Sequence, residues 1–420
     1  MDRQKPSGKP FDISKWEVLD AWEKVRANKG APGGDGVSLG EFESDLKGNL
    51  YKTWNRMSSG SYFPPPVKAV EIPKPHGGGT RILGVPAIAD RVAQTVVAAR
   101  LEKAAEPVFH PDSYGCRPRR SALHAVAACR KRCWKYDWVI DLDVRKFFDS
   151  VPWNLIVKAV EAHTGLPWVL LYVKRWLAAP IQQPDGTLPE RDRGTPQGSA
   201  VSPVLANLFM HYALDMWLAR EYPGVESERY ADGAVVHCVT RYQAEKVLAA
   251  IGERMAQAGL RLHPAKTRIV YCKDANRRGS HEHTSFTFSG FTFRARPARA
   301  RDGTLFASFQ PAISKDALNK ISGEVRRWRL HRWIGLTMGQ IAREINPVVR
   351  GWMQYYGAFY RSALYPVLQR INACLMRWLR DKHKRLRPMK KAKAAWQRVI
   401  SQYPLLFAHW AWAAASWWTR

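Results

Sequence analysis

The chain has 420 residues and a formal net charge of +30, because 66 Lys and Arg residues outnumber 36 Asp and Glu residues. This balance excludes an ordinary metabolic enzyme as the default interpretation and favours a protein that binds nucleic acid. Aromatic residues make up 11% and hydrophobic residues 46% of the chain. Such a composition can bury a core, so a disordered basic tail is excluded and two or three folded domains are expected.

The cysteines and the apolar runs predict a reduced, soluble, intracellular protein. Six cysteines form no CxxC pair, and nothing that resembles a secretory signal precedes the first charged residues, Asp2, Arg3 and Lys5. Cys129 and Cys133 have the spacing of two metal ligands on a helix, but no second cluster accompanies them, so we interpret them as ordinary thiols. The apolar runs fall far short of the roughly 18 residues that a membrane span needs.

The region 1–61 is expected to form a small helical entry region. Apolar residues recur at helical spacing from Trp16 to Val25, and a second helical stretch follows a glycine-rich break at 29–37. From Tyr62 the chain becomes β-like and is punctuated by prolines. It predicts a strand, a tip of three glycines and a returning strand, which together make a basic β-hairpin.

The middle of the chain mixes helical and strand patterns. Helices are predicted at 88–107, 153–177, 201–220 and 242–258, and strands at 138–151, 228–239, 267–272 and 284–294. The run at 138–151 ends in acidic residues, as a buried strand that enters a loop would. Because helices separate the strands without a regular parallel repeat, we expect an α+β fold.

The composition changes after about residue 310. Residues 311–420 contain 21 Lys or Arg residues, 4 Asp or Glu residues and 9 of the 18 Trp residues, so they carry +17 of the net charge. We expect a separate basic, helical domain. A solvated helical face is the alternative, but the run at 381–398 is too one-sided to pair its charges internally, which favours binding to a phosphate backbone. The candidate RNA-binding residues are Arg350, Trp352, Lys382, Lys384, Arg385, Arg387, Lys390, Lys391 and Lys393.

Two carboxylates are candidates for a catalytic metal site. Polynucleotide synthesis uses two divalent ions about 3.5–4 Å apart, which requires acids from separate strands to meet at one point. Asp143 follows the apolar run WVIDL, and Asp232 lies at the expected tip of a β-turn-β hairpin in RYADGAVVHC. Asp141 and Asp149 flank Asp143, and strand alternation places Asp141 on the same face as Asp143, so the residues alone leave these acids open.

Several collinear motifs resemble those of one family. The segments DLDVRKFFDSV, RGTPQGSAVSPVLANLFM, RYADGAVVHC, GLRLHPAKTRIVY and FSGFTF occur in the order and spacing of the palm motifs of reverse transcriptases. NPVVRGWMQYYGAFY at 346–360 resembles the thumb, or maturase X, domain, and the whole chain resembles a group II intron reverse transcriptase-maturase. The resemblance implies a right-hand polymerase with an N-terminal extension at 1–61, fingers and palm at 62–300, an all-helical thumb at 311–385 and a basic aromatic tail at 386–420.

The resemblance also implies roles for individual residues. Asp143 and Asp232 match the metal-binding acids, the Val144 carbonyl completes the site, and two Mg²⁺ ions, replaceable by Mn²⁺, are the expected cofactor. The matches to nucleotide-binding positions are Lys74 and Arg81 for the triphosphate, Phe148 under the sugar, Gln197 in the PQG turn and Lys266 near the phosphates. Lys and Arg suit a triphosphate because one supplies a point charge and the other a bidentate fork. The alternatives are a core position for Phe148 and solvated charges on the hairpin.

One position departs from the family pattern. The family usually has Tyr-Ala-Asp-Asp, whereas here Gly233 follows Asp232, so one acid of the hairpin tip is absent. We expect Asp143 and Asp232 to suffice for polymerisation, with weaker metal binding. The alternatives are a splicing-only, RNA-binding maturase and a host reverse transcriptase recruited into antiviral defence or repair.

The resemblance implies the partners as well. They are group II intron RNA, an RNA template, a DNA primer or target, and dNTPs, with no membrane. No Cys or His cluster has the spacing of a zinc-supported HNH nuclease, so we expect no cleavage of the second target strand. The expected location is the bacterial cytoplasm, at the nucleoid through the DNA target, and the oligomeric state is left open.

Overall fold

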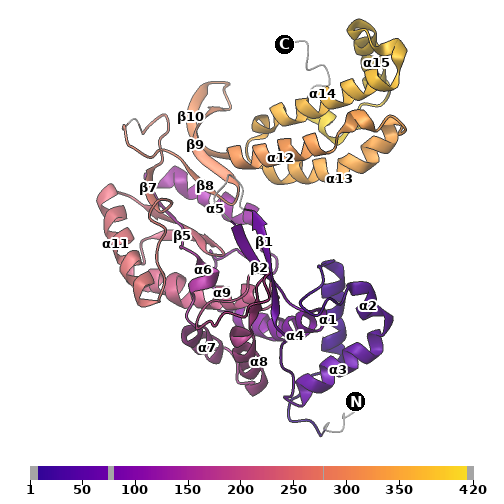
Figure 1. Cartoon of the computed structure of the whole chain (residues 1–420). Coiled ribbons are helices and arrows are strands. Elements are labelled where there is room, and N and C mark those ends of the chain that lie inside the picture. Colours follow the sequence, from indigo (N-terminus) through magenta and orange to yellow (C-terminus); the bar gives the residue numbers. More distant parts are fainter. Residues whose placement is uncertain (1–7, 74–79, 278, 414–420) are drawn as a thin grey trace, which may run out of the picture. The chain divides into compact units, whose positions relative to one another are not determined.

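The computed structural model describes residues 8–73, 80–277 and 279–413 (Figure 1). The chain divides into two units. The first consists of Met1–Ser121, Ile140–Val236 and Arg241–Arg268, and the second of Ala122–Val139, His237–Thr240 and Ile269–Arg420. Each unit therefore combines segments that are far apart along the chain.

Three helices open the first unit: α1 (Lys15–Ala27), α2 (Leu39–Ser44) and α3 (Leu46–Ser58). A capping box starts α1, where Ser14 and Glu17 satisfy backbone N–H groups reciprocally. Ser38 and Glu41 do the same at α2. The predicted glycine-rich break lies between α1 and α2, so the helical entry region is confirmed.

The predicted hairpin follows. β1 (Val67–Pro73) pairs antiparallel with β2 (Thr80–Val85), and β4 (Ile181–Gln182) pairs parallel with β1. The predicted glycine tip and Lys74 lie outside the described residues. Arg81 lies near the start of the returning strand, where it pairs with Ile72.

The other helices of the first unit differ in part from the predicted pattern. They are α4 (Ile88–Ala105), α6 (Phe147–Ser150), α7 (Trp153–Glu161), α8 (Pro167–Ala178), α9 (Ser202–Met210), the π-helical turn η2 (His211–Asp215), α10 (Met216–Glu221) and α11 (Arg241–Gln257). A single helix at 153–177 is wrong, because Pro167 begins a new helix, a position that proline favours. The predicted helix at 201–220 is interrupted by η2.

A four-stranded sheet has the order β5–β6–β3–β7. Its strands are β5 (Glu226–Tyr230), β6 (Gly233–Cys238), β3 (Trp138–Leu142) and β7 (Arg268–Tyr271). Only Ala231 and Asp232 separate β5 from β6, as the predicted hairpin requires. As the run at 138–151 predicts, a strand gives way to a loop: β3 ends at Leu142, and α6 begins after a turn in which Lys146 has φ +47°. The chain therefore leaves the strand directly before Asp143.

The second unit contains a helix, a three-stranded sheet of order β10–β9–β8 and a group of C-terminal helices. The elements are α5 (Ala122–Lys135), β8 (Phe286–Phe288), β9 (Phe291–Arg299), β10 (Leu305–Ile313), α12 (Lys315–Arg327), η3 (Leu330–Arg332), α13 (Met338–Tyr356), η4 (Arg361–Leu364), α14 (Tyr365–Lys382), η5 (Lys384–Leu386), α15 (Met389–Gln402) and η6 (Ala408–Ala411). The predicted strand at 284–294 is two strands, because Ser289 and Gly290 form a turn with positive φ.

One hydrophobic core joins the C-terminal helices. Trp378 and Trp396 are fully buried in it, together with Phe407 from the predicted tail. Residues 386–413 thus pack with the helices that precede them. Several of the tryptophans that the sequence offers as stacking surfaces for bases are core residues instead.

Within the described parts of the chain, no helix combines the length and the hydropathy that crossing a membrane requires. All six cysteines are free thiols. Cys129 and Cys133 are buried on α5 with their Sγ atoms 3.9 Å apart.

Candidate active site

One cavity of about 940 Å³ in the first unit collects the residues expected to bind metal and nucleotide. Its lining includes Arg81, Asp143, Val144, Phe148, Gln197, Asp232 and Lys266. Every predicted metal- or nucleotide-binding residue in the described part of the chain therefore lines the same space. Lys74, the remaining one, lies outside the described residues.

Backbone pairing holds Asp143 directly after β3. The His263 N–H donates to the Asp143 carbonyl at 2.8 Å, and the Arg145 N–H donates to the Arg261 carbonyl at 2.9 Å. These two bonds flank Val144, which forms an isolated antiparallel bridge. The central residue of such a bridge directs its own N–H and C=O away from the paired segment. The Val144 carbonyl is therefore left for another partner.

Lys266 places a positive charge beside Asp143. Its Nζ lies 2.9 Å from Asp143 Oδ2, with the two side chains 64% and 32% exposed. Thr267 Oγ1 lies 3.2 Å from the Asp143 carbonyl oxygen, to which it donates. A pair this exposed adds little to stability. Its effect is on the charge balance of the cavity.

Asp232 lies at the tip of the β5–β6 hairpin, which is pressed against a neighbouring segment. Ala231, the first connecting residue, has φ +57°, a conformation that costs a non-glycine residue about 1 kcal/mol or more. Gly115 approaches so closely that a Cβ there would lie 2.3 Å from the Ala231 nitrogen. The Tyr114 N–H also donates to the Arg229 carbonyl at 2.8 Å. Glycine at 115 therefore permits a contact that fixes the hairpin tip.

Arg229 ties this hairpin to the interior of the first unit. It is 2% exposed and donates two hydrogen bonds to Asp215, at 2.8 and 2.6 Å. The remaining N–H groups of its guanidinium donate to the Ala231 carbonyl at 2.8 Å, to Asn207 Oδ1 at 3.0 Å and to Ser113 Oγ at 2.8 Å. All five guanidinium N–H groups are thus used. The sequence analysis missed this residue, because its strand reads ESERY and no apolar pattern marks it as buried.

The surroundings of Asp232 disfavour its charged form. Burial raises the pKa of Asp232, and the neighbouring Asp143 carboxylate raises it further, whereas Arg81 and Lys266 lower it. A bound cation favours the ionised carboxylate and releases its proton. Cation binding at this position should therefore strengthen as the pH rises.

The structure separates Asp141 from Asp143. Arg268 Nε lies 3.7 Å from Asp141 Oδ2, and burial raises the pKa of Asp141 to about 7 despite this arginine. Among the described residues that line the cavity, Asp143 is present and Asp141 is not. The choice that strand alternation left open is thus decided by where β3 ends.

A glycine turn supports Phe148. Gly194 has φ +80°, and a Cβ there would lie 2.8 Å from the Phe148 carbonyl oxygen. The Thr195 N–H donates to that oxygen at 2.7 Å. The Phe148 ring packs at 5.2 Å against the buried Phe147 and is only half-buried itself. One part of the ring therefore contacts the core, and another is available to the cavity.

The PQG turn contacts β2 through two glycines. The Gly84 N–H donates to the Gln197 carbonyl at 2.7 Å. Gly198 has φ +113°, and a Cβ there would lie 2.5 Å from the Gly84 carbonyl oxygen. On the buried side, the Ser199 hydroxyl donates to Gln94 Oε1 at 2.6 Å. These contacts fix the backbone that presents Gln197 to the cavity.

A buried acid on α4 anchors Gln94 in turn, and the sequence analysis did not find it. Asp90 accepts hydrogen bonds from Gln94 Nε2 at 2.8 Å, Trp176 Nε1 at 2.7 Å and the Tyr62 hydroxyl at 3.0 Å. Burial raises the pKa of Asp90 to about 6, although these donors oppose the shift. The PQG turn is thus supported from α4 by a polar network.

The donor set fits a divalent metal ion. Two carboxylates, from Asp143 and Asp232, and the Val144 carbonyl are hard oxygen ligands of the kind that Mg²⁺ takes together with water and phosphate. Gly233 adds no ligand, yet a Cβ there would meet only the Tyr230 carbonyl oxygen, at an ordinary 3.8 Å. The site therefore has room for the acid that it lacks.

More basic residues line this cavity than the sequence analysis selected. They are Arg145, Lys146, Arg191, Arg193 and His263, in addition to Arg81 and Lys266. Arg145 and Lys146 closely follow Asp143 in the sequence, and Arg191 and Arg193 precede the PQG turn. The proximity of these residues to the motifs was the signal that could have identified them. The lining also includes Asp149, Glu190 and Asp192. The cavity thus combines several acids, which can hold cations, with several Lys and Arg side chains, which suit a phosphate-bearing substrate.

The predicted RNA-binding residues all belong to the second unit, but some of them have internal partners. Trp352 stacks on Trp328 at 5.5 Å and packs against the helical core. Lys382 donates to the Leu336 carbonyl at 2.5 Å. The exposed members of the set are Arg350 on α13, Lys384 and Arg385 in η5, Arg387 after it, and Lys390 and Lys391 on α15, while Lys393 is half-buried.

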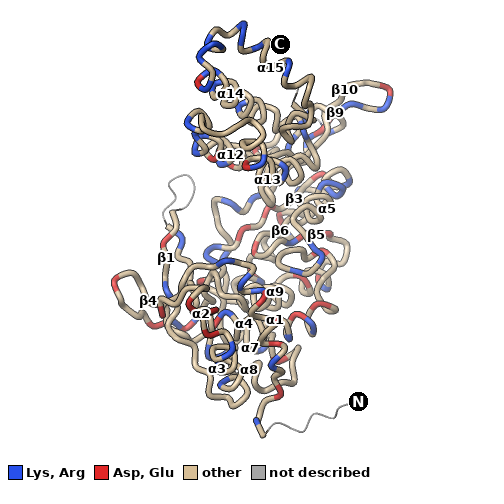
Figure 2. Tube along the Cα trace, turned by 90° about the vertical axis from the view of Figure 1, so that its right-hand side faces the viewer, with Lys and Arg blue, Asp and Glu red and all other residues tan. Residues whose placement is uncertain are grey.

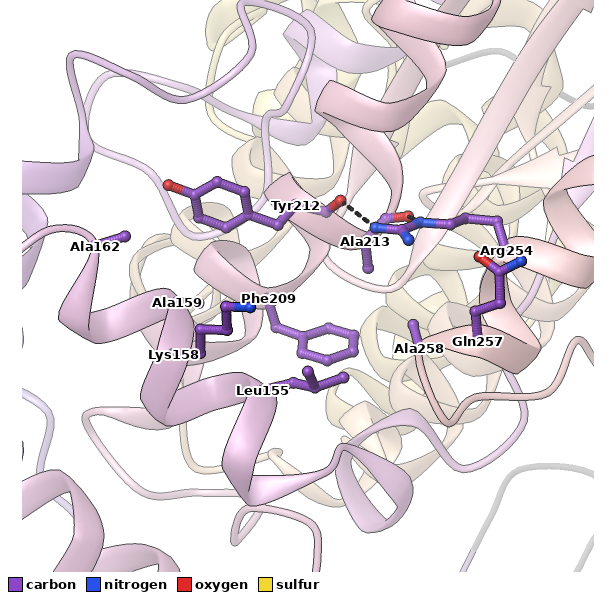
Figure 3. Close-up of a pocket in the computed structure, with 10 residues that line it drawn as sticks. All are labelled: Leu155, Lys158, Ala159, Ala162, Phe209, Tyr212, Ala213, Arg254, Gln257 and Ala258. Atoms are coloured by element: carbon purple, nitrogen blue, oxygen red, sulfur yellow. Dashed lines mark hydrogen bonds between the residues drawn. The ribbon is translucent and has the colours of Figure 1, made fainter.

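A second, smaller cavity lies apart from the predicted residues (Figure 3). It has about 350 Å³ and lies between α7, α9 with η2, and α11, with Leu155 and Phe209 among its apolar lining. Arg254 donates to the carbonyls of Tyr212 and Ala213 at 3.0 Å each. These carbonyls belong to the π-helical turn, so the arginine has a structural task there.

The comparisons with known proteins agree with this geometry. Residues 72–293 match the family "Reverse transcriptase (RNA-dependent DNA polymerase)", and residues 318–398 match the "Group II intron, maturase-specific domain". Protein YkfC of Escherichia coli is 33% identical over 49% of this chain and 55% of its own length. The group II intron-encoded protein LtrA of Lactococcus lactis is 28% identical over 46% of this chain and 32% of its own.

A third relative is similar over more of the chain. An uncharacterised 91 kDa protein in the cob intron of Schizosaccharomyces pombe is 24% identical over 89% of this chain and 54% of its own length. The chain thus spans about half, or less, of the curated relatives that it matches. The reverse transcriptase match covers more than half of the chain, and it is followed by the maturase match. The chain therefore belongs to the reverse transcriptase family, in its group II intron type with a maturase domain.

Proposed function

We propose that this protein is an RNA-directed DNA polymerase that copies group II intron RNA into DNA. The observation that carries the proposal is the convergence of Asp143 and Asp232 on one cavity with Arg81, Phe148 and Gln197. These five residues come from four separate parts of the sequence. A core that merely buried these residues would have no reason to gather two acids and several cations around one solvent-filled space.

The family uses divalent metal ions, and we propose Mg²⁺ for this chain, with Mn²⁺ as a substitute. Asp143, Asp232 and the Val144 carbonyl would hold the ions. When bound, they would activate the primer 3′-hydroxyl and hold the triphosphate. Arg81 and Lys266 would bind phosphate oxygens of the dNTP, and Lys74 would add a further charge from the fingers hairpin. Gln197 would contact the nucleotide or the template.

We further propose that the protein acts as a maturase by binding and stabilising folded intron RNA for splicing. The C-terminal helices carry exposed basic residues, and the maturase-specific match covers 318–398. Residues 62–300 would form fingers and palm, and 311–385 the thumb or maturase X domain. The extension at 1–61 and the region 386–420 would flank them, the latter with further contacts to DNA or RNA.

Two alternatives can be distinguished from this proposal, the first by a primer-extension assay and the second by the sequence that flanks the gene. A splicing-only maturase would bind RNA without extending a primer, with Gly233 as the mark of decay. The other members of the site argue against decay, because loss of function should scatter changes through all of them. A host reverse transcriptase for antiviral defence or repair would lack a flanking intron RNA in the genome.

The experiment that tests the proposal is primer extension on an RNA template with Mg²⁺ or Mn²⁺. Incorporation of dNTPs that depends on the template and on the metal supports the polymerase. RNA binding without any extension would favour the splicing-only maturase. In the cell, we place the protein at its DNA target in the bacterial nucleoid.

Phe148→Val is expected to weaken discrimination against ribonucleotides. The half-buried ring lies where it would meet a 2′-hydroxyl, so a smaller side chain removes the clash while Gly194 and Thr195 still hold the backbone. The measurement is the ratio of kcat/KM for dNTP over NTP, which should fall by about tenfold or more, since one steric contact is worth 1–3 kcal/mol. An unchanged ratio would return Phe148 to a purely structural role.

Neutralising Lys390, Lys391 and Lys393 together by Gln is expected to weaken RNA binding and leave primer extension unchanged. For a single strand, each phosphate that the protein no longer neutralises lowers the slope of log K against log salt by about 0.7, so three lower it by about 2. The measurement pairs RNA affinity at several salt concentrations with turnover on a short primer–template. Loss of turnover at constant RNA affinity would contradict the proposal that the palm polymerises while the basic C-terminal region binds RNA.

A further inference from the structure

The proposed function leaves one exposed arm of the second unit without a role. β9 and β10 pair antiparallel along their entire length, and the half that adjoins β8 is buried. The other half is largely exposed and extends from 294 to 307. We call residues 294–307 the ribbon.

The base of the ribbon is rigidly supported. Phe286 and Phe293 stack with ring centroids 4.7 Å apart. The Trp134 indole donates to the Phe309 carbonyl at 2.9 Å, and the Tyr360 hydroxyl donates to the Pro297 carbonyl at 3.2 Å. A surface presented on such a support loses little conformational entropy when it binds a partner.

The ribbon carries positive charge that the protein does not compensate. Arg294, Arg299 and Arg301 are exposed, and among the described residues none of them has an ion-pair partner. The sole acid of the ribbon is Asp302, whose carboxylate accepts the Thr304 N–H at 2.9 Å in a turn at the tip. Figure 2 shows Lys and Arg positions on the β9–β10 hairpin, with an acidic position near its tip.

Arg296 differs from these three residues and serves as an internal comparison. It is half-buried, its Nε donates to the Gln310 carbonyl at 3.2 Å, and its guanidinium lies 5.5 Å from the Tyr360 ring. The chain thus fixes one arginine of β9 against its own structure. The other arginines are left to water or to a ligand.

Exposed apolar side chains accompany these charges. Leu305 is 67% exposed and Phe306 43% exposed. Leu305 pairs with Arg299 across the strands, and Phe306 pairs with Ala298. Directly opposite residues share a face of the ribbon, so the methyl group of an alanine leaves the Phe306 ring uncovered. Because faces alternate along each strand, Arg294 lies on the face of Phe306, whereas Arg299 lies with Leu305 on the opposite face. The exposed ring offers one face on which an unpaired base stacks, while arginines on both faces of the ribbon hold the phosphates of the strand.

We propose that the ribbon is a binding site for single-stranded RNA. Arg294, Arg299 and Arg301 bind its phosphates, and Phe306 stacks on an unpaired base. The exposed aromatic ring favours a single strand over a duplex, because bases inside a duplex do not offer their faces. This site rests on the proposed function for its RNA, but it shares no residue with the lining of the polymerase cavity or with the basic residues predicted on the C-terminal helices.

The competing explanation is protection of a strand edge. Charged side chains on exposed strands prevent edge-to-edge association with other chains. That explanation accounts for the arginines but not for an uncovered phenylalanine and leucine beside them. It predicts aggregation, with unchanged RNA binding, when the arginines are removed.

The test uses the full chain and three variants. One replaces Arg294, Arg299 and Arg301 by Gln, and the second is Phe306→Ser. The control replaces three exposed cations of the first unit, Lys174, Arg220 and Lys246, by Gln. The probes are a fluorescein-labelled oligouridine of about 16 nucleotides, within the range of single-strand sites, and a blunt RNA–DNA hybrid of the same length.

The arginine variant should lower the salt slope for oligouridine by about 2, and Phe306→Ser should weaken its binding by about tenfold. The control should leave both quantities unchanged. Equal losses in the control would overturn the proposal in favour of general attraction by net charge. A loss confined to the hybrid would also overturn it, as would aggregation with an unchanged slope. Primer extension by the same preparations reports separately on the proposed polymerase, which the ribbon variants should leave intact.

Discussion

Asp232→Asn is expected to extend a primer about 10³-fold more slowly than the parent chain and to bind RNA with unchanged affinity. The change keeps the shape of the side chain but removes one of the two carboxylates that we propose as metal ligands in the cavity. Metal ions at such a site supply several kcal/mol of charge stabilisation in the transition state, and each 1.36 kcal/mol is worth about tenfold in rate. RNA affinity should hold because the basic C-terminal helices are untouched.

The matched control for this variant is Asp185→Asn. Asp185 is an exposed aspartate of the same unit whose carboxylate accepts the Thr187 N–H in a turn, at 3.0 Å. Its replacement should leave primer extension at the parent level. Normal extension by Asp232→Asn would remove this residue from the metal site.

Gly233→Asp shows whether the missing acid limits the natural chain. The site has room for the side chain, because a Cβ at Gly233 meets only one carbonyl oxygen at an ordinary distance. We expect the parent to extend the primer and Gly233→Asp to do so at lower Mg²⁺ concentration, since a third carboxylate adds negative charge near the ions. If only Gly233→Asp extends, the natural chain is a maturase that kept the fold and lost the polymerase.

Arg229→Met is expected to lower both the stability of the protein and its rate of primer extension. The guanidinium makes five hydrogen bonds in the interior, two of them to Asp215 and one to the Ala231 carbonyl next to Asp232. Removing it leaves a buried carboxylate without its partner, a change that typically costs about 3–5 kcal/mol. It also releases the backbone of the hairpin tip.

A double variant separates these two effects. In Arg229→Met with Asp215→Leu, no buried charge lacks a partner, so thermal unfolding should return most of the way to the parent Tm. The Ala231 carbonyl still lacks its donor, so primer extension should stay low at every Mg²⁺ concentration. Recovery of extension together with stability would show that Arg229 acts only on folding. Arg229→Lys should recover little of either, because an ammonium cannot reproduce the bidentate fork.

Much of the site could be predicted because its signals are local. Asp143 follows an apolar strand, Asp232 occupies a two-residue turn between two strands, and Ser14 and Ser38 begin helices by capping their first turns. Each of these features depends on residues within a few positions of one another. The same locality explains why Arg81 and Gln197 were found within their motifs.

The errors in the predicted elements also have physical causes. Apolar spacing continues through 153–177, but Pro167 cannot extend the preceding helix and begins a new one. The apolar run at 138–151 continues past the end of β3, because Phe147 is buried by a short helix rather than by the strand. A hydrophobic pattern predicts which residues are buried more reliably than it predicts whether a helix or a strand buries them.

The sequence by itself indicated Asp232, the hairpin that carries it and the basic character of the C-terminal region, and the family resemblance implied Asp143. Only the tertiary structure decided that Asp143 rather than Asp141 lines the cavity, and that Trp378 and Trp396 belong to a core. It also joined Arg229 to Ser113, which lies 116 residues away along the chain. The physical reason is that a pattern specifies which side of an element is apolar or charged, whereas contacts depend on which sides of distant elements meet.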